Sequence, residues 1–172
     1  FGNTKPTRVS TSNLVSNAGV VATDTTGVGT ARYALAACSY GGDKGIFAYG
    51  DTGSYTAVSN LVSNAGVVAS DTSGVGTARQ YSAATEYGGD KGIFGYGYAS
   101  GNVSMTNLVS NSGVVSSDVS GVGTARHYPA ACGYGEDKGI FGYGNSSSLT
   151  NLISNVGVVS ADVTGVGTAR HY

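Results

Sequence analysis

The sequence predicts an all-β protein built from repeated four-stranded sheets, and three observations support this prediction. An internal repeat runs through the whole chain, which is typical of folds assembled from small identical units. Apolar residues never keep helical spacing for three turns before a glycine interrupts them, so the pattern excludes long helices. Short runs of alternating polarity are bounded by Gly, Asn, Asp and Ser clusters, which is typical of strands joined by turns.

The repeat has two alternating halves. The first half begins Asn-Leu-Val-Ser-Asn, or Asn-Leu-Ile-Ser-Asn in its last copy, and continues through a Val-Val pair and an Asp to Gly-Val-Gly-Thr-Ala-Arg. Its four copies start at Asn13, Asn60, Asn107 and Asn151, with spacings of 47, 47 and 44 residues. The second half reads Tyr-Gly-x-Asp-Lys-Gly-Ile-Phe-x-Tyr-Gly and occurs at 40–50, 87–97 and 134–144.

One full repeat is expected to hold four strands. In the copy that follows Arg32 they fall near 33–39, 44–49, 58–63 and 66–71. Four antiparallel strands in about 47 residues is the size of one blade of a β-propeller. The first strand consists of small residues, which suit the crowded position beside a central channel.

The second strand alternates. We expect Phe47 and Tyr49 on one face and Ile46 and Ala48 on the other, because successive side chains of a strand point to opposite faces. Later copies replace Ala48 with glycine. A sheet that is aromatic on one face and nearly bare on the other can nest against its neighbour, so stacked repeats would bury a core that no single repeat could form.

The chain is therefore interpreted as one propeller over residues 1–172, with three and a half blades. The expected division is a partial blade at 1–31, whole blades at 32–78, 79–125 and 126–169, and the start of another at 170–172. A partial blade exposes unpaired strand edges and an uncovered apolar face. We expect either self-association or a longer parent chain to complete the ring.

Composition excludes several classes of function. Nine basic and ten acidic residues give a net charge of −1, and charged residues make up 11% of the chain. No block of like charge supplies the field that binds nucleic acid, and no apolar run is long enough to span a bilayer. Cys38 and Cys132 are too few for a disulfide framework and are expected to be small buried side chains.

The order of motifs resembles a kelch-type repeat. In that family a hydrophobic strand ends in glycine, an outer pair of strands follows, and a small-residue-Arg step leads into the next blade. The near-identical copies are also similar to the propeller repeats of marine bacteriophage tail-fibre and virion proteins. These resemblances imply recognition of a host-surface glycan or protein, or scaffolding, and a virion or extracellular location.

Charged residues that recur at the same position in each repeat, here called repeat-locked, are expected to stabilise the fold. Each Asp should accept the amides of its own Asp-x-Ser/Thr-Gly turn, and each Arg should join neighbouring blades by charge-assisted hydrogen bonds. An Arg ring that binds an anion at the channel mouth is the alternative. The Asp-Lys pairs at 43–44, 90–91 and 137–138 are interpreted as solvated turns. The structural set comprises Asp24, Arg32, Asp71, Arg79, Asp118, Arg126, Asp162 and Arg170.

Nothing in the sequence indicates catalysis. Both histidines, His127 and His171, follow a repeat Arg and have no distinctive nucleophile beside them. The histidines, cysteines and carboxylates do not show the spacing of a metal site, so no metal or cofactor is expected. We expect a non-enzymatic protein. An enzyme with its site at the channel mouth and a purely structural self-assembling repeat are the alternatives.

Binding residues are sought where the repeats differ. One variable position is the pair after each Arg, which includes His171 and Tyr172, and the other is the loop at 51–59 and 98–106, shortened to 145–150 in the last repeat. Tyr55 and Tyr98 are expected to be exposed there, in a Ser/Gly/Asn-rich setting that suits adaptable binding loops. Loops that only keep the protein soluble are the other interpretation. The candidate binding residues are Tyr33, Tyr55, Gln80, Tyr81, Tyr98, His127 and Tyr128.

Overall fold

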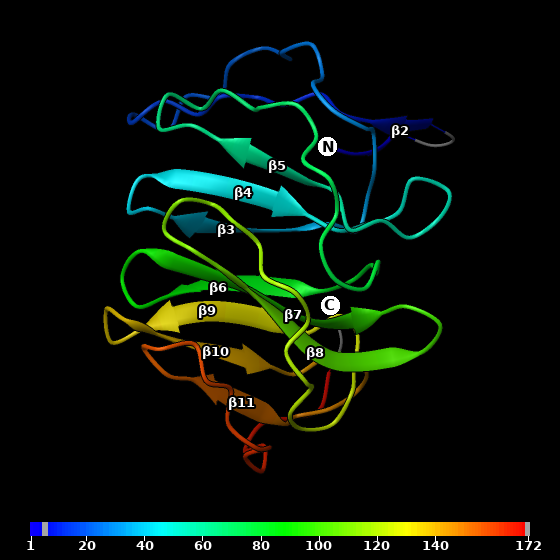
Figure 1. Ribbon diagram of the computed structural model, residues 1–172, viewed down its shortest axis with the longest axis vertical. Helices are drawn as coiled ribbons and strands as arrows, with labels where there is room; N and C mark the ends of the chain where they lie inside the picture. Colours follow the sequence, from blue (N-terminus) through cyan, green and yellow to red (C-terminus); the bar gives the residue numbers. More distant parts are fainter. Residues whose placement is uncertain (5–6, 171–172) are drawn as a thin grey trace.

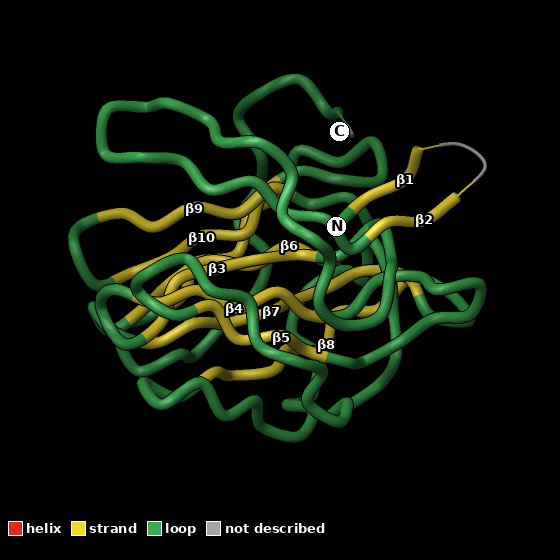
Figure 2. The backbone as a smooth tube through the Cα atoms, turned by 90° about the horizontal axis from the view of Figure 1, so that it is seen from above, coloured by secondary structure: helices red, strands yellow, loops and turns green. Residues whose placement is uncertain are grey.

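A computed structural model describes residues 1–4 and 7–170 of the chain. These residues form only strands and loops, so the all-β prediction is confirmed for them (Figure 2). Among them no helix has the length and hydrophobicity that a membrane crossing needs. The strands are β1 (Gly2–Thr4), β2 (Thr7–Val9), β3 (Ala36–Tyr40), β4 (Lys44–Ala48), β5 (Ser59–Val62), β6 (Ala83–Tyr87), β7 (Lys91–Tyr98), β8 (Asn102–Val109), β9 (Ala130–Tyr134), β10 (Lys138–Gly142) and β11 (Thr150–Ile153).

The strands form several small antiparallel sheets. Three sheets have the orders β3-β4-β5, β6-β7-β8 and β9-β10-β11, and β1 pairs with β2 in a separate hairpin. Each three-stranded sheet belongs to one repeat unit: the first at 32–78, the second at 79–125 and the third at 126–169. Residues 1–31 form an N-terminal half-unit.

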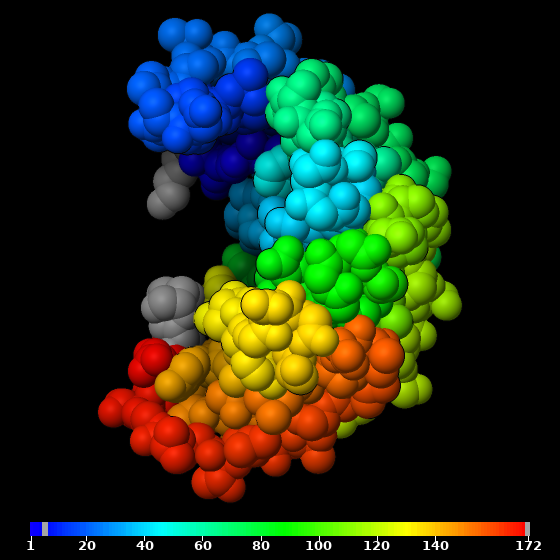
Figure 3. Space-filling view, turned by 90° about the vertical axis from the view of Figure 1, so that its left-hand side faces the viewer, coloured from blue at the N-terminus to red at the C-terminus, as the bar shows by residue number. Residues whose placement is uncertain are grey.

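The sheets lie face to face (Figure 1). β3 lies against β6, and β6 lies against β9. In Figure 3 the units follow one another along an arc that is hollow on one side, with the N-terminal residues at one end and the C-terminal residues at the other. The half-unit and the third unit therefore lie on the two sides of this hollow.

In the first unit, the first three strands lie close to their expected positions, whereas the expected fourth strand is not a regular strand. Residues 66–72 pair with β5 through two isolated bridges, Val62–Val68 and Ser59–Thr72. Between the bridges, the side-chain Nδ2 of Asn60 donates to the Ala69 carbonyl at 3.1 Å. Because this amide takes the place of a ladder hydrogen bond, the outer segment bulges and cannot continue as a strand.

The expectation that Phe47 and Tyr49 share a face is wrong. Phe47 packs towards the half-unit, where its ring centroid lies 5.5 Å from that of Phe1, whereas Tyr49 contacts Phe94 of the second unit at 5.4 Å. The cause is the backbone of Tyr49, which has a φ of 65°. This left-handed residue ends the strand after Ala48 and reverses the side-chain alternation.

The expected loop at 98–106 is mostly strand. β7 continues to Tyr98 and β8 begins at Asn102, so only 99–101 connect them. The ladder continues past a bulge between Gly95 and Gly97 and ends in the pair Tyr98–Asn102. Tyr98 is consequently half-buried rather than exposed.

The core lies between units. Ile46, Ala48 and Tyr49 of the first unit form one buried cluster with Phe94 and Val109 of the second. A second cluster joins the second and third units in the same way, through Ile93, Tyr96, Phe141 and Ile153. Each unit therefore buries its apolar surface by covering the next one.

The two cysteines differ, although both were expected to be buried. Cys38 packs against the first cluster, and burial raises the pKa of its thiol to about 12. Cys132 holds the same position in the third unit but is exposed. Among the described residues no further unit covers this side of the third sheet, which explains the difference.

Candidate functional site

Each repeat Arg joins two units. The Arg79 guanidinium is fully buried and lies 3.9 Å from the centre of the Tyr49 ring in the preceding unit. Within its own unit Arg79 donates from Nε to the Tyr96 carbonyl at 2.9 Å and from Nη2 to Asn107 Oδ1 at 2.8 Å. The charge is thus stacked on one side and hydrogen-bonded on the other.

The repeat Asp residues of the three complete units join units too, but their partners differ from those expected. Asp118 does not accept the amides of its own turn. Its Oδ2 accepts the Thr77 backbone N–H at 3.0 Å and the Thr77 hydroxyl at 2.7 Å, and its Oδ1 accepts Asn107 Nδ2 at 2.9 Å. Thr77 lies at the end of the preceding structural segment, so the carboxylate fixes the chain where one unit passes into the next.

The alternative of an anion-binding Arg ring does not fit these contacts. Arg32, Arg79 and Arg126 are at most 1% exposed, and each donates to a carbonyl and an Asn of the protein. Their charge therefore serves the contacts between units.

The Asp-Lys pairs lie in exposed turns, as interpreted from the sequence. Lys44 Nζ lies 2.9 Å from Asp43 Oδ1, and the hydrogen bond with Lys44 holds the pKa of Asp43 below its ordinary value. These turns also touch along the arc: the Gly41 N–H donates to the Asp90 carbonyl at 2.7 Å. The exposed ion pair itself contributes little to stability.

The candidate binding residues converge, although the sequence places them in separate segments. We use the name aromatic strip for Tyr55, Tyr98, His127, Tyr81 and Tyr128. Neighbouring ring centroids lie 6.2 Å apart for Tyr55–Tyr98, 5.8 Å for Tyr98–His127, 6.3 Å for Tyr81–His127 and 4.1 Å for Tyr81–Tyr128. The aromatic strip crosses three consecutive units. Tyr55 is 38% exposed and the others are half-buried.

The backbone holds the aromatic strip in place. Tyr81 and Tyr128 have φ values of 56° and 55°, and the Tyr128 N–H donates to the Tyr81 carbonyl at 3.0 Å. The Tyr81 N–H donates to the Ala34 carbonyl at the same distance. The hydrogen bond with Tyr128 also raises the pKa of the Tyr81 phenol.

Tyr33 extends the site towards the half-unit. Its side chain forms a hydrogen bond with Tyr81, and Arg8 lies 5.3 Å above its ring. Arg8 also pairs with Asp51 at 2.9 Å. Arg8 and Asp51 are not among the binding residues predicted from the sequence. The sequence does contain a clue to them, because both charged residues fall outside the set that recurs at the same position in every repeat.

Several polar atoms at this end of the units are buried without a hydrogen-bond partner. Among the described residues they are Gln80 Oε1, Ser82 Oγ and Arg8 Nε. Gln80 is 8% exposed and pairs through its backbone with Tyr98 of the aromatic strip. Buried polar atoms are normally satisfied, so these three leave hydrogen-bonding capacity for a ligand or water.

The remaining candidates offer little chemistry. His127 Nδ1 lies 2.8 Å from Asn102 Oδ1. In the described part of the chain no three His, Cys, Asp or Glu side chains are grouped to hold a metal ion. His171 and Tyr172 lie outside the described residues.

Comparisons with known proteins find no protein-family model that matches the chain and no curated protein that matches it.

Proposed function

We propose that the chain is a recognition module of the propeller type, which binds a surface glycan through the aromatic strip. The observation that carries this proposal is the gathering of five rings from three units, at positions where the repeats differ. Most residues that build the sheets recur in every unit. A unit-specific surface is free to serve binding.

The arrangement of the units supports a propeller. The sheets lie face to face along an arc, with strands β3, β6 and β9 against one another. This is the arrangement expected of blades around an axis. The irregular outer segment supplies the fourth position of each blade. The kelch-type order of motifs favours the same architecture.

A glycan is the ligand class that fits best. Tyr rings present large rigid apolar faces, and their hydroxyls donate and accept hydrogen bonds. The unpartnered Gln80 Oε1 can accept a hydrogen bond from a sugar hydroxyl beside these rings. Weak single sites gain avidity when many copies act together, as on a virion or tail fibre.

The test is a glycan array probed with the full chain and with Tyr55→Ala/Tyr98→Ala. We expect specific glycan signals that fall at least tenfold in the double variant. Tyr134→Ala is the matched control, because Tyr134 is 41% exposed but lies outside the aromatic strip. Signals that survive the double variant would remove the aromatic strip as the site.

A blank array combined with capture of a cell-surface protein that depends on Tyr98 would reassign the ligand to protein. Turnover of a glycan that is abolished by His127→Ala would favour the enzyme alternative instead. A purely structural repeat would show neither binding nor turnover.

A further inference from the structure

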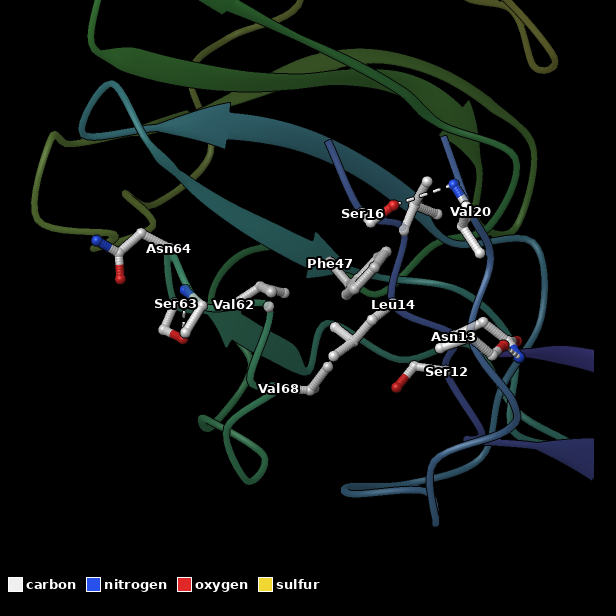
Figure 4. Close-up of a pocket in the computed structure, with 14 residues that line it drawn as sticks. Ser12, Asn13, Leu14, Ser16, Val20, Phe47, Val62, Ser63, Asn64 and Val68 are labelled. Carbon is white, nitrogen blue, oxygen red and sulfur yellow. Dashed lines mark hydrogen bonds between the residues drawn. The ribbon is translucent and has the colours of Figure 1, made fainter. Parts of the chain in front are cut away.

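An apolar groove of about 680 Å³ lies at the N-terminal end of the arc (Figure 4). Phe47, Val62 and Val68 of the first unit line one side, and Leu14 and Val20 of the half-unit line the other. Val20 is 65% exposed and Leu14 is 46% exposed. The groove therefore leaves core-type side chains open to solvent.

The contacts between complete units show what fills the same place elsewhere. In the second unit, Phe94, Val109 and Val115 hold the repeat positions of Phe47, Val62 and Val68. They are covered by the cluster that includes Tyr40 and Ile46, from the inner hairpin β3–β4 of the preceding unit. The groove lacks that Tyr and that Ile.

The half-unit already has the beginning of such a contact. Phe1 holds the repeat position of Tyr49, and its 5.5 Å distance to Phe47 matches the 5.4 Å between Tyr49 and Phe94. Arg32 lies 4.6 Å above the Phe1 ring, in the way that Arg79 lies above Tyr49. The backbone of the half-unit is thus placed as in a complete unit.

The half-unit also carries hydrogen-bond acceptors that, in the complete units, are used by an Arg and a Thr. Asn13 Nδ2 donates to the Ala22 carbonyl at 3.0 Å and to Asp24 Oδ1 at 2.8 Å, the pattern of Asn60 and Asp71. In the first unit the Asn oxygen also accepts an Arg, and the Asp also accepts a Thr. Among the described residues, Asn13 Oδ1 and Asp24 Oδ2 have neither partner.

We propose that the groove is a docking site for one inner hairpin of this same repeat, preceded by its Thr-Ala-Arg. The Arg would donate to Asn13 Oδ1 and to the Phe1 carbonyl, and the Thr would donate to Asp24. The hairpin would place its Tyr and Ile against Phe47, Val62 and Leu14. A complete repeat unit would then stand where the half-unit stands now.

The occupant is specified by chemistry rather than by shape alone. Its cation must lie fifteen residues before the Phe of the hairpin's second strand, as Arg126 lies before Phe141. A generic apolar peptide would fill the groove but leave Asp24 without its partners. The inference is independent of the ligand that the aromatic strip binds.

The test has two arms and uses the full chain. In the first, a synthetic peptide with the sequence of 124–142 is titrated into the protein and binding is followed by calorimetry. We expect saturable binding of one peptide per chain. Replacing Arg126 by Ala in the peptide, or Asp24 by Ala in the protein, should weaken it at least tenfold.

Matched controls keep the first arm specific. Lys138→Ala in the peptide and Val166→Ser in the protein alter exposed side chains away from the proposed contacts and should leave the affinity unchanged. Equal affinity for the Arg126→Ala peptide would overturn the proposal.

In the second arm, 124–142 are fused directly before Phe1, so that the hairpin need not fold in isolation. We expect the unfolding temperature to rise by about 4 °C or more and the binding of an apolar dye to fall. Both effects should be lost when the fused segment carries Ala in place of its Arg. A fusion with unchanged unfolding temperature, together with no peptide binding, would overturn the proposal.

Discussion

The guanidinium of Arg79 stacks 3.9 Å from the ring centre of Tyr49, a residue of the preceding unit. The same contact recurs between Arg126 and Tyr96 at 4.1 Å. A buried cation needs both stacking and hydrogen bonds to offset its desolvation. The Arg thus stacks on a ring of the preceding unit while its hydrogen bonds hold it within its own unit.

We expect Arg79→Ala to lower the free energy of unfolding by about 3 kcal/mol or more, because it leaves Asn107 and the Tyr96 carbonyl buried without their donor. Urea denaturation measures the loss. Arg170→Ala is the matched control, since Arg170 has the same repeat position but is exposed. A change of equal size at Arg170 would contradict the role of burial.

Gly95→Ala should destabilise the protein by about 1–3 kcal/mol through overpacking. A Cβ at this position would lie 2.6 Å from Phe141 Cζ of the third unit. Gly142 holds the same repeat position, but there a Cβ would lie 3.4 Å from its nearest neighbour, Thr150 Cγ2. Gly142→Ala should therefore change stability little. If the two variants were equally stable in thermal unfolding, the close approach of the sheets would be wrong.

Stability should fall in acid through the Asp residues between units. Burial raises the pKa of Asp118, but hydrogen bonds from Thr77 and Asn107 outweigh it, so the net pKa is lowered from 3.8. A depressed pKa adds stability above the unfolded-state value and loses it as the pH falls further. At pH values below about 4, the unfolding temperature should therefore decrease, and the decrease should be smaller in Asp118→Asn.

The two thiols should react at very different rates. With a pKa raised to about 12, Cys38 holds almost no thiolate at pH 8. We expect one thiol per folded chain to react quickly with a disulfide reagent and the second to be at least about a hundredfold slower. Cys132→Ser should remove the fast phase. A fast phase that persists in this variant would place Cys38 at the surface.

Much of the fold could be predicted because the repeat encodes local structure. The Gly-Ile-Phe strand and the Asn-Leu-Val-Ser strand lie near their expected positions, since alternation and turn residues act over short distances. The reversal at Tyr49 could not be predicted, because a left-handed tyrosine has no local signal. The partners of Asp118 were missed for a related reason: Thr77 lies 41 residues away in sequence.

The candidate site was predicted residue by residue but not as a whole. Variation among the repeats identified Tyr81 and Tyr98 separately, and only the pairing of Gln80 with Tyr98 brings the two segments together. Arg8 was overlooked because its contact with Tyr33 joins the half-unit to the first unit. Contacts across units depend on how sheets stack, which composition and periodicity do not specify.

The most direct test of the interlocked units is a double-mutant cycle between Arg79 and Tyr49. Unfolding free energies of Arg79→Met, Tyr49→Leu and the double variant give the coupling between the two side chains. We expect a coupling of about 2 kcal/mol, as for a desolvated cation over an aromatic ring. A coupling near zero would contradict an Arg that joins one unit to the next.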